Sequence, residues 1–346
     1  MKKGASYQGL KKSLVLFAAL LGLLYGVIFL FPVVPNQSNT VDGSSYKVKI
    51  NPNSGLTSIA DQLSAQGLAV NSVVLQLGAR SLLIGSKLKP GTYLLPCGAS
   101  LGNVLLQIAR GDRVRETIAI IPGMTIWQLR ALMDSQSALI HRTKGMPNKE
   151  LLQQLNLSFP SDEGIFLPDT YIFDPDELDI NIYRRAAQAM QKQLIQIWEQ
   201  RDSELPLKTP YELLILASIV EKETGRLSDR NLVSAVFINR LNKGMPLQTD
   251  PTVIYGIGPK FDGNLKKADL RRNTPYNTYM HKGLPPTPIA MPSKESILAA
   301  AHPAKSNALF FVAKGDGSSH FSQNLKDHEA AVDRYQRKIM PKNNSN

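Results

Sequence analysis

The sequence predicts an α+β protein that begins with a membrane-spanning helix. Three features support this fold class. The run from Ser13 to Phe31 is apolar and carries no charged side chain. The middle of the chain alternates short strand-like segments, such as YKVKI (46 to 50), with segments whose apolar residues recur at helical spacing. The last third is mainly helical in pattern and contains one candidate β-hairpin. Together these features favour an anchor, a small α/β subdomain and a mainly helical domain.

The first element is interpreted as an uncleaved anchor. A helix rises about 1.5 Å per residue, so the run 13–31 is long enough to cross a bilayer. FPVVPNQS follows it, without the small-x-small site that a cleavable signal peptide needs. Lys2, Lys3, Lys11 and Lys12 all precede the run. The positive-inside rule then keeps the N-terminus in the cytoplasm and places the chain after residue 35 across the membrane.

The charge of the chain gives no reason to expect a nucleic-acid partner. The 346-residue chain has a formal net charge of +12, and four of its 40 basic residues belong to the anchor flank. The remaining 36 basic residues against 28 acidic ones give a mild excess. Such an excess suits an acidic surface polymer, and it equally suits a solvated basic surface with no partner. Cys97 has no partner for an internal disulfide and is expected to be a small buried residue.

The chain divides into six segments by composition and pattern. The segment after the anchor is polar and contains Pro, Gly and Ser, which predicts a mobile tether. The predicted segments are a cytoplasmic tail 1–12, an anchor 13–31, a tether 32–45, a small α/β domain 46–136, a helical linking region 137–204 and a catalytic domain 205–340.

Each element of the small domain has its own local signal. YKVKI alternates like a strand, and LTSIADQLSAQGL has helical spacing with Gly67 near its end. A helix over 72–82, a strand at GTYLL (91 to 95) and a helix over 100–109 follow. TIAIIPGMTIWQLRALM (117 to 133) repeats the strand, turn and helix order of residues 48–63. A duplicated module and a chance recurrence of a common order both remain open.

Two further patterns are found in the chain after the small domain. Residues 137–203 are expected to be mainly helical, with Pro168 and Pro175 preventing one continuous helix, and Asp169 is expected to fix the joint between modules. LFFVAKGDGSSHFS (309 to 322) predicts a hairpin with Asp316 and Gly317 at its turn.

The stretch LLILASIVEKETGR (213 to 226) raises a question about its two glutamates. Thr209, Pro210 and Glu212 have the spacing of a capping box, which predicts a helix from residue 210, and Gly225 predicts its end near Thr224. At about 100° per residue, Glu221 lies with Ser218 and Lys222 on a polar edge, whereas Glu223 lies between Leu216 and Ile219 on the apolar side.

A carboxyl group on the apolar side of a helix end is a candidate general acid. Burial raises a carboxyl pKa, and the negative end of the helix dipole acts in the same direction. Both effects keep the proton on the group near neutral pH. The alternative is a structural glutamate that reaches solvent or pairs with Arg226 or Arg240.

Longer motifs in the same region carry a resemblance to a known family. ILASIVEKETG, VFINRLNKGMPLQTDPTVIYGIG, TPYNTYMHKGLPPTPIAMPS and AAHPAKSNALFFVAKGDGSSHF resemble the endolytic murein transglycosylases of the YceG-like family. The resemblance covers nearly all of residues 45–337. It implies a single-pass inner-membrane protein with a LysM-like subdomain and a lysozyme-like catalytic region. Thr287, where the family usually has glycine, and Met291, where a polar residue is frequent, depart from the pattern.

The resemblance also implies a reaction. Glu223 matches the family's catalytic glutamate. It would protonate the leaving oxygen of the MurNAc-GlcNAc bond and then accept the proton of the muramyl C6 hydroxyl, which attacks its own anomeric carbon. The product is a 1,6-anhydromuramyl end, and the cut would terminate glycan elongation. A tethered hydroxyl acts at effective molarities of about 10⁵ M or more, so a second carboxylate is not obligatory.

Further site residues follow from the motifs that match the family. Gln248 and Tyr279 are the preferred substrate contacts. Local loop support is the alternative for the Asn and Asp residues, and core packing is the alternative for the tyrosines. The candidate substrate-binding residues are Thr224, Asn239, Gln248, Asp250, Thr252, Tyr255, Asn277 and Tyr279.

No metal or cofactor is expected. His281, His302, His320 and His328 lack the close spacing of a zinc site. A pyridoxal-phosphate lyase is disfavoured because an exported domain is a poor place for that cofactor. The stronger rival is a non-catalytic, membrane-anchored scaffold that binds peptidoglycan.

The expected partners are peptidoglycan glycan strands and the inner membrane, with the catalytic domain in the periplasm. Peptidoglycan synthases and elongation or division proteins are further candidate partners.

Overall fold

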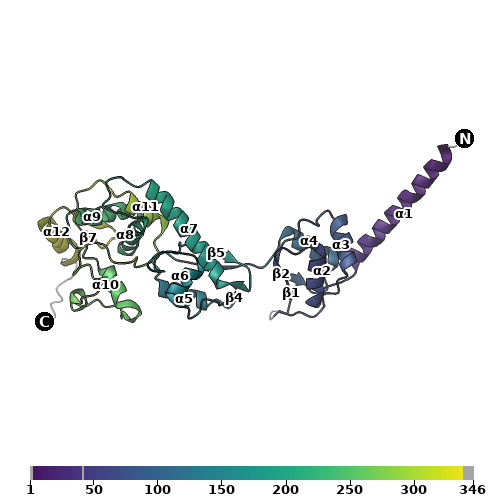
Figure 1. Cartoon of the computed structure of the whole chain (residues 1–346), viewed down its shortest axis with the longest axis horizontal. Helices are drawn as coiled ribbons and strands as arrows, with labels where there is room; N and C mark the ends of the chain where they lie inside the picture. Colours follow the sequence, from purple (N-terminus) through teal and green to yellow (C-terminus); the bar gives the residue numbers. More distant parts are fainter. Residues whose placement is uncertain (1–2, 41–42, 338–346) are drawn as a thin grey trace, which may run out of the picture. The chain divides into compact units, whose positions relative to one another are not determined.

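A computed structural model describes residues 3–40 and 43–337 of the chain (Figure 1). Met1 and Lys2 of the predicted cytoplasmic tail, two residues of the predicted tether and residues 338–340 of the predicted catalytic domain lie outside these ranges. The chain forms two compact units. Unit 1 contains residues 1–116 and 172–175, and unit 2 contains residues 117–171 and 176–346. Mixed helices and strands with one apolar N-terminal helix confirm the predicted α+β class at this level.

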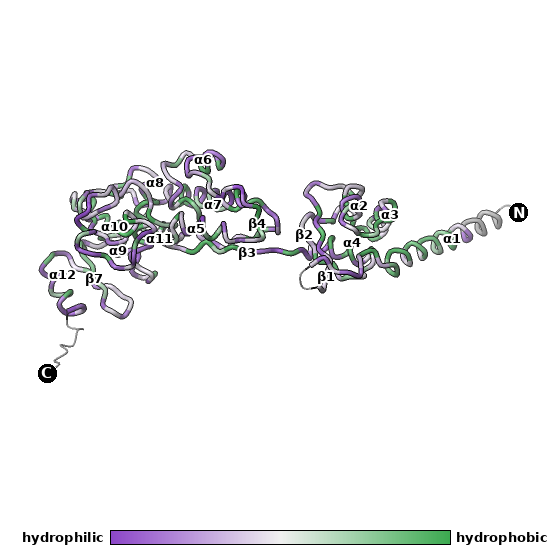
Figure 2. Tube along the Cα trace, turned by 90° about the horizontal axis from the view of Figure 1, so that it is seen from below, coloured by the Kyte–Doolittle hydropathy of each residue, from purple (hydrophilic) through white to green (hydrophobic). Residues whose placement is uncertain are grey.

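Unit 1 consists of a long helix and a small α/β domain. Helix α1 (Lys3–Leu30) includes an apolar stretch, Lys11–Leu30, that is long enough to cross a membrane, and Figure 2 shows the part of α1 nearer the small domain in the green of hydrophobic residues. The small domain contains β1 (Ser45–Ile50), α2 (Leu56–Ala65), α3 (Ser72–Ser81), β2 (Gly91–Pro96) and α4 (Leu101–Arg110). Strands β1 and β2 pair antiparallel, with Ser45 opposite Pro96 and Ile50 opposite Gly91.

The segment directly after α1 differs from the predicted mobile tether. The N–H groups of Val33 and Val34 donate to the carbonyl of Ala99 at 2.9 and 3.1 Å, and the Val34 side chain is buried. Apolar residues at the start of this segment therefore attach it to the small domain. Cys97 also differs from its prediction, because it is partly exposed instead of buried.

The division between the units falls at Glu116, earlier than the boundary at 136 that the sequence suggested. Helix α5 (Ile126–Asp134) explains the difference, because its side chains and backbone form hydrogen bonds with later parts of unit 2. Arg130 donates to Asp162 at 3.0 Å, and the Ile126 N–H donates to Glu163 at 2.9 Å.

Unit 2 is mainly helical, with short paired strands at its start and near its end. Strand β4 (Leu139–Ile140) pairs parallel with β6 (Glu177–Leu178). Strands β3 (Glu116–Ala119) and β5 (Thr170–Phe173) lie where the chain passes from one unit to the other. The Ile120 N–H donates to the carbonyl of Asp169 at 2.9 Å. The longer helices are α6 (Asn148–Gln154), α7 (Asp179–Glu199), α8 (Pro210–Glu223), α9 (Arg230–Asn242), α10 (Asp250–Ile257), α11 (Lys294–Ala301) and α12 (Leu325–Val332).

The predicted C-terminal hairpin is confirmed. Strand β7 (Phe310–Ala313) pairs antiparallel with β8 (Ser319–Ser322), and Gly317 in the turn has a φ of 81°. The Asp316 carboxylate accepts from the Ser318 N–H at 2.9 Å, which closes the turn. A short 3-10 turn, Leu227–Asp229, joins α8 to α9, two more lie at Gly258–Lys260 and Asp269–Arg271, and a π-helical turn, Asp333–Arg337, ends the described chain.

Helix α8 lies at the centre of unit 2. It contacts α7, α9, α10 and α11, and every residue from Leu213 to Val220 is buried. A helix that is apolar all round is typical of the core of a larger domain. Because all of these neighbours are fixed against it, α8 is a rigid support for the groups at its C-terminal end.

Candidate active site

The start of α8 agrees with the sequence prediction. The Thr209 hydroxyl accepts from the Glu212 N–H at 3.2 Å, and Pro210 occupies the first helical position. The end differs in mechanism. Thr224 leaves the helix in an extended conformation, with φ −145°, and its hydroxyl accepts from the Arg226 N–H at 3.1 Å. Gly225 therefore does not serve as a left-handed cap.

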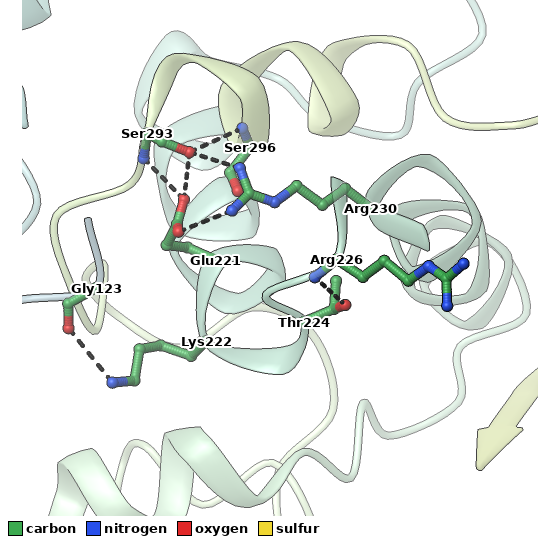
Figure 3. Close-up of polar contacts among 8 residues, drawn as sticks. All are labelled: Gly123, Glu221, Lys222, Thr224, Arg226, Arg230, Ser293 and Ser296. Carbon is green, nitrogen blue, oxygen red and sulfur yellow. Dashed lines mark hydrogen bonds and ion pairs between the residues drawn. The ribbon is translucent and has the colours of Figure 1, made fainter. Parts of the chain in front are cut away.

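Glu221 is held in a buried ion pair. Its carboxylate accepts from Arg230 at 3.1 Å and from the N–H and hydroxyl of Ser293, the N-cap of α11 (Figure 3). The side chains of Glu221 and Arg230 are only 6% and 8% exposed. Arg230 also donates to the Ser293 hydroxyl at 2.7 Å. Glu221 therefore ties three helices together and has no free face for a substrate.

The polar edge predicted for α8 is thus packed against other parts of unit 2 over most of its length. Ser218 is fully buried, where its hydroxyl donates to the Ile215 carbonyl at 2.7 Å and accepts from the Ile289 N–H at 3.0 Å. Only Lys222 turns outward, with its ammonium 3.3 Å from the Gly123 carbonyl (Figure 3). Burial of every residue from Leu213 to Val220 explains the difference, because solvent reaches α8 only near its ends.

Glu223 has a different environment. It is partly buried, accepts a hydrogen bond from the Thr249 hydroxyl and lines a pocket of about 370 Å³. The other residues that line this pocket come from α9, α10, α12, β7 and the loops before α10 and after residue 278, and are Phe237, Arg240, Leu247, Gln248, Asp250, Tyr279, Phe310, Phe311, Leu325 and His328. Glu223 is therefore a carboxyl group at the wall of a cavity large enough for part of a sugar.

The pKa of Glu223 is raised from 4.5 to about 6, chiefly because burial disfavours the carboxylate. The hydrogen bond from Thr249 and the charge of Arg240 lower this pKa, and the nearby Asp250 carboxylate raises it. A carboxyl group with a pKa near 6 is about half protonated at pH 6 and about one tenth protonated at pH 7, far more than an ordinary glutamate, and is still able to give up its proton. Both states are then accessible in one catalytic cycle.

A network of threonines holds the Thr249 hydroxyl beside Glu223. The Thr249 N–H donates to the Thr278 hydroxyl at 3.1 Å, and its carbonyl accepts from the buried Thr252 hydroxyl at 2.7 Å. Thr249 is the N-cap residue of α10. Gln248 before it has a φ of 49°, a conformation that non-glycine residues rarely adopt. The strained turn fixes where Gln248 lines the pocket and where the Thr249 hydroxyl meets Glu223.

Two further polar groups complete the pocket wall. The Tyr279 hydroxyl donates to the Asp250 carboxylate at 2.6 Å. Arg240 is largely buried, where its guanidinium donates to the carbonyls of Leu247 and Leu309 at 2.7 Å each. Burial lowers the pKa of Arg240, and the charge of Glu223 opposes that change. These groups place fixed dipoles and one cation around Glu223.

The other predicted site residues lie behind or beside the pocket. Asn239 donates to the carbonyls of Ser306 and Ala308 at 2.7 and 2.9 Å and so holds that loop. Asn277 is fully buried, where its amide nitrogen donates to three carbonyls and its oxygen accepts from the Tyr279 N–H at 3.0 Å. Thr224 and Thr252 also bond locally. Of the candidates, the structure brings Gln248, Asp250 and Tyr279 to the pocket with Glu223.

Tyr255 belongs to an aromatic cluster next to α10. Its ring stacks on Trp127 at a centroid distance of 4.9 Å and meets Tyr276 edge-on at 4.8 Å. All three side chains are partly exposed. Glu163, next to Tyr255, is fully buried and accepts a hydrogen bond from the N–H of Ile126 at 2.9 Å. Burial raises the pKa of Glu163 to about 8. A hydrogen bond from Tyr255 opposes that rise.

Sequence reasoning missed several of these residues. Thr249 lies inside the quoted QTDPT motif but has no chemical group that suggests catalysis by itself. Arg240 was considered only as a partner of Glu223. Trp127 and Glu163 lie 83 and 47 residues before the start of α8 at Pro210 (210 − 127 and 210 − 163), so no local pattern connects them to it. The one available signal was DEG before IFLPDT, a pair of acids directly before an apolar run.

Within the described ranges, no group of three or more His, Cys, Asp or Glu side chains is arranged to hold a metal ion. Among the candidate histidines His281, His302, His320 and His328, His328 lines the Glu223 pocket and stacks on Phe310 at a centroid distance of 5.1 Å. The His302 ring lies 2.7 Å from Asp202, and the His281 ring lies 2.7 Å from Asn273. The polar groups of the pocket suit acid–base chemistry and hydrogen bonding to a neutral ligand.

Comparison with known proteins agrees with this site. The sequence model of the YceG-like family matches residues 48–334, which is most of the chain. The chain belongs to the YceG-like family. The match includes α8, α10, the pocket and the C-terminal hairpin.

Similar proteins extend over nearly the same residues of this YceG-like chain. It is 31% identical over 332 residues to a Bacillus subtilis protein named endolytic murein transglycosylase, which covers 90% of this chain and 89% of that protein. It is 28% identical to a Streptococcus pneumoniae protein of the same name, of which it spans 64% of the length. A solved structure of a putative YceG-like protein from Listeria monocytogenes is 27% identical, has a TM-score of 0.54 and covers 83% of this chain.

The two glutamates of α8 give opposite predictions for the stability of this YceG-like protein. Glu221→Gln leaves Arg230 buried without its charge partner, so we expect the free energy of unfolding to fall by about 3 kcal/mol. Glu223→Gln is the matched control on the same helix. Stability from a raised carboxyl pKa is present below 4.5 and is lost as the pH rises through about 6, so at pH 7 the Glu223 carboxylate weakens folding. We therefore expect Glu223→Gln to be no less stable than the parent.

Urea unfolding at pH 7, followed by the fluorescence of Trp127 and Trp198 in unit 2, measures both changes. A Glu221→Gln variant as stable as the parent would contradict the structural role of this pair.

Proposed function

We propose that this chain is a membrane-anchored endolytic transglycosylase that cleaves peptidoglycan glycan strands and uses Glu223 as its single acid and base. The observation that carries the proposal is a partly buried carboxyl group with a pKa near 6 at the wall of a pocket. The similar proteins from B. subtilis and S. pneumoniae bear the name of this activity. A non-catalytic scaffold would not need a desolvated carboxyl group at such a place, which costs folding free energy.

The proposed reaction proceeds in two proton transfers. Glu223 gives its proton to the oxygen that links MurNAc to the next GlcNAc, and the bond from that oxygen to the muramyl anomeric carbon breaks. The carboxylate then accepts the proton of the muramyl C6 hydroxyl while that oxygen bonds to the anomeric carbon. Glu223 regains its proton and water is not consumed. The C6 hydroxyl is tethered to the reacting carbon, which replaces a second nucleophile.

The surrounding groups have separate roles in this scheme. The Thr249 hydroxyl donates to one carboxyl oxygen of Glu223 and so fixes its direction. Asp250 and Tyr279 form a bonded pair at the pocket wall, where the negative charge stabilises a developing oxocarbenium ion. Arg240 favours the carboxylate form that follows the first proton transfer. Gln248 is positioned to hydrogen bond a sugar substituent.

The domain assignments extend this proposal. The order β1, α2, α3, β2 with antiparallel strands supports a LysM-like, glycan-binding role for unit 1. The glutamate at the end of a buried helix in a mainly helical unit supports a lysozyme-like catalytic domain in unit 2. The apolar α1 supports single-pass anchoring in the inner membrane. The lysines at its N-terminal end support a cytoplasmic N-terminus and a periplasmic catalytic domain.

The activity test uses the full-length protein in detergent with intact glycan strands, followed by mass spectrometry of the ends. We expect anhydromuramyl ends, and we expect Glu223→Gln to lower their rate of formation by about 10² to 10⁴ fold, the usual contribution of general acid–base catalysis. Glu199→Gln, an exposed carboxyl group at the end of α7, is the matched control and should retain full activity.

Reaction in ¹⁸O-labelled water separates the proposal from hydrolysis. Anhydro ends contain no label. Labelled reducing ends would contradict the transglycosylase reaction and would point to hydrolysis with Asp250 as a second carboxylate. Unchanged activity in Glu223→Gln would contradict the assignment of the acid.

The aromatic cluster of Trp127, Tyr255 and Tyr276 is proposed to bind a sugar ring of the strand away from the cleaved bond. Partly exposed aromatic faces suit the apolar faces of sugars. We expect Trp127→Ala to raise KM by about tenfold, equivalent to about 1.4 kcal/mol, with little change in kcat. Trp198→Ala is the matched control, since the Trp198 ring, in α7, lies 3.7 Å from the guanidinium carbon of Arg201, just after that helix.

Steady-state kinetics on long strands measures this effect. An equal fall of kcat for both tryptophan variants, with KM unchanged, would refute a binding role for the cluster.

A further inference from the structure

The last turns of α1 are part of the hydrophobic core of unit 1. Ile28 is fully buried in this core, and Leu24 and Phe29 pack against it. The Tyr25 hydroxyl donates to the Ser81 carbonyl at 3.3 Å. Gly78 permits the close approach, because a Cβ atom there would lie 3.0 Å from Ile28 Cδ1. Helix α1 is therefore packed against α3, and it also contacts α4; its C-terminal end runs into the small domain in both views (Figures 1 and 2).

These contacts give the direction of α3 relative to α1. Ile28 contacts Gly78, whereas Tyr25, one turn earlier in α1, contacts Ser81, one turn later in α3. The two helices thus run in opposite directions along this contact. The C-terminal end of α3 consequently points back along α1, towards the middle of the apolar helix.

The depth of this contact follows from helix geometry. The apolar stretch Lys11–Leu30 is about 30 Å long at 1.5 Å per residue, which matches the hydrocarbon thickness of a bilayer. Tyr25 lies five residues before Leu30, or about 7 Å inside the end of that stretch. A membrane that α1 crosses therefore reaches the level of Ser81 and the turn that follows it.

The side chains at this end of α3 suit a membrane interface. Leu83 is 81% exposed and Leu77 is 47% exposed. Arg80 and Lys87, also exposed, flank them. Apolar side chains bordered by basic ones are typical of surfaces that enter the headgroup region of a bilayer.

The backbone conformation of Leu83 also supports contact with a membrane. Its φ of 56° is left-handed, which costs a leucine roughly 1 to 2 kcal/mol. Glycine or asparagine would fit such a turn better in water, and neither would expose an apolar side chain. Removal of the Leu83 side chain from water would offset this cost.

We infer that the interfacial tip of unit 1, defined as Leu77, Arg80, Leu83 and Lys87, inserts into the headgroup and upper acyl region of the bilayer that α1 crosses. The inference rests on the proposed anchoring by α1. Its partner is a lipid surface, with anionic headgroups favoured by the two basic side chains. Unit 1 is then fixed at the membrane surface and does not swing from a tether.

Site-specific fluorescence on the full-length chain tests this inference. The protein carries Cys97→Ser and a single new cysteine, is labelled with an environment-sensitive dye and is reconstituted in vesicles of phosphatidylcholine and phosphatidylglycerol in equal parts. Lipids with a nitroxide near the headgroup end of the acyl chain quench dyes at that depth, and lipids with a nitroxide near the chain terminus quench dyes at the centre of the bilayer, where residue 20 is expected. Leu83→Cys and Leu77→Cys report the tip, and two tip sites guard against a local change at the strained turn.

Two control sites make the outcome decisive. Leu20→Cys, exposed in the middle of α1, reports insertion of the anchor. Arg115→Cys is at an exposed position after the C-terminal end of α4. Helix α4 approaches α1 at its other end, where Gly102 lies next to Phe29. We expect the dyes at residues 83 and 77 to be quenched severalfold more than the dye at residue 115.

Tip dyes that respond like the dye at residue 115, while the dye at residue 20 is quenched, would overturn the inference and leave the anchor intact. Absence of quenching at residue 20 would refute the anchor and the inference together. Neither result depends on catalytic activity, so the proposed reaction is tested separately.

Discussion

The cost of removing one carboxylate from water is the constraint on which the site depends. Glu223 is the last residue of a helix in which every residue from Leu213 to Val220 is buried. The helix cannot rotate or shift without breaking contacts with α7, α9, α10 and α11. The carboxyl group is therefore held where burial raises its pKa, and local groups adjust the value. Thr249 and Arg240 lower it, whereas Asp250 raises it.

Two glutamates on one helix illustrate how surroundings divide structure from chemistry. Residues 221 and 223 are about 200° apart around α8, so they face different neighbours. Glu221 meets a buried arginine and the N-cap of α11, and its charge is fully compensated. Glu223 meets a hydroxyl group, a distant cation and a pocket. The first carboxylate stabilises the fold, and the second is available to exchange a proton.

Local signals in the sequence were sufficient for many elements but not for their surroundings. The cap at Thr209, the hairpin at 309–322 and the helices of unit 1 depend on nearby residues, and they were predicted correctly. The helical wheel separated Glu223 from Glu221, although its polar edge is in fact buried. Local patterns could not predict which residues distant in the sequence would contact one another. Thr249 beside Glu223, Arg230 beside Glu221 and Phe29 beside Gly102 join residues that only the tertiary fold brings together.

The pKa of Glu223 in the folded protein is the most direct test of this account. Protein with ¹³C-labelled glutamate side chains is titrated by NMR, and the resonance missing from Glu223→Gln identifies the group. The account predicts a midpoint near 6 and well above that of an exposed glutamate. A midpoint near 4 would show that Glu223 is solvated like an ordinary surface carboxylate and would contradict its role as the acid.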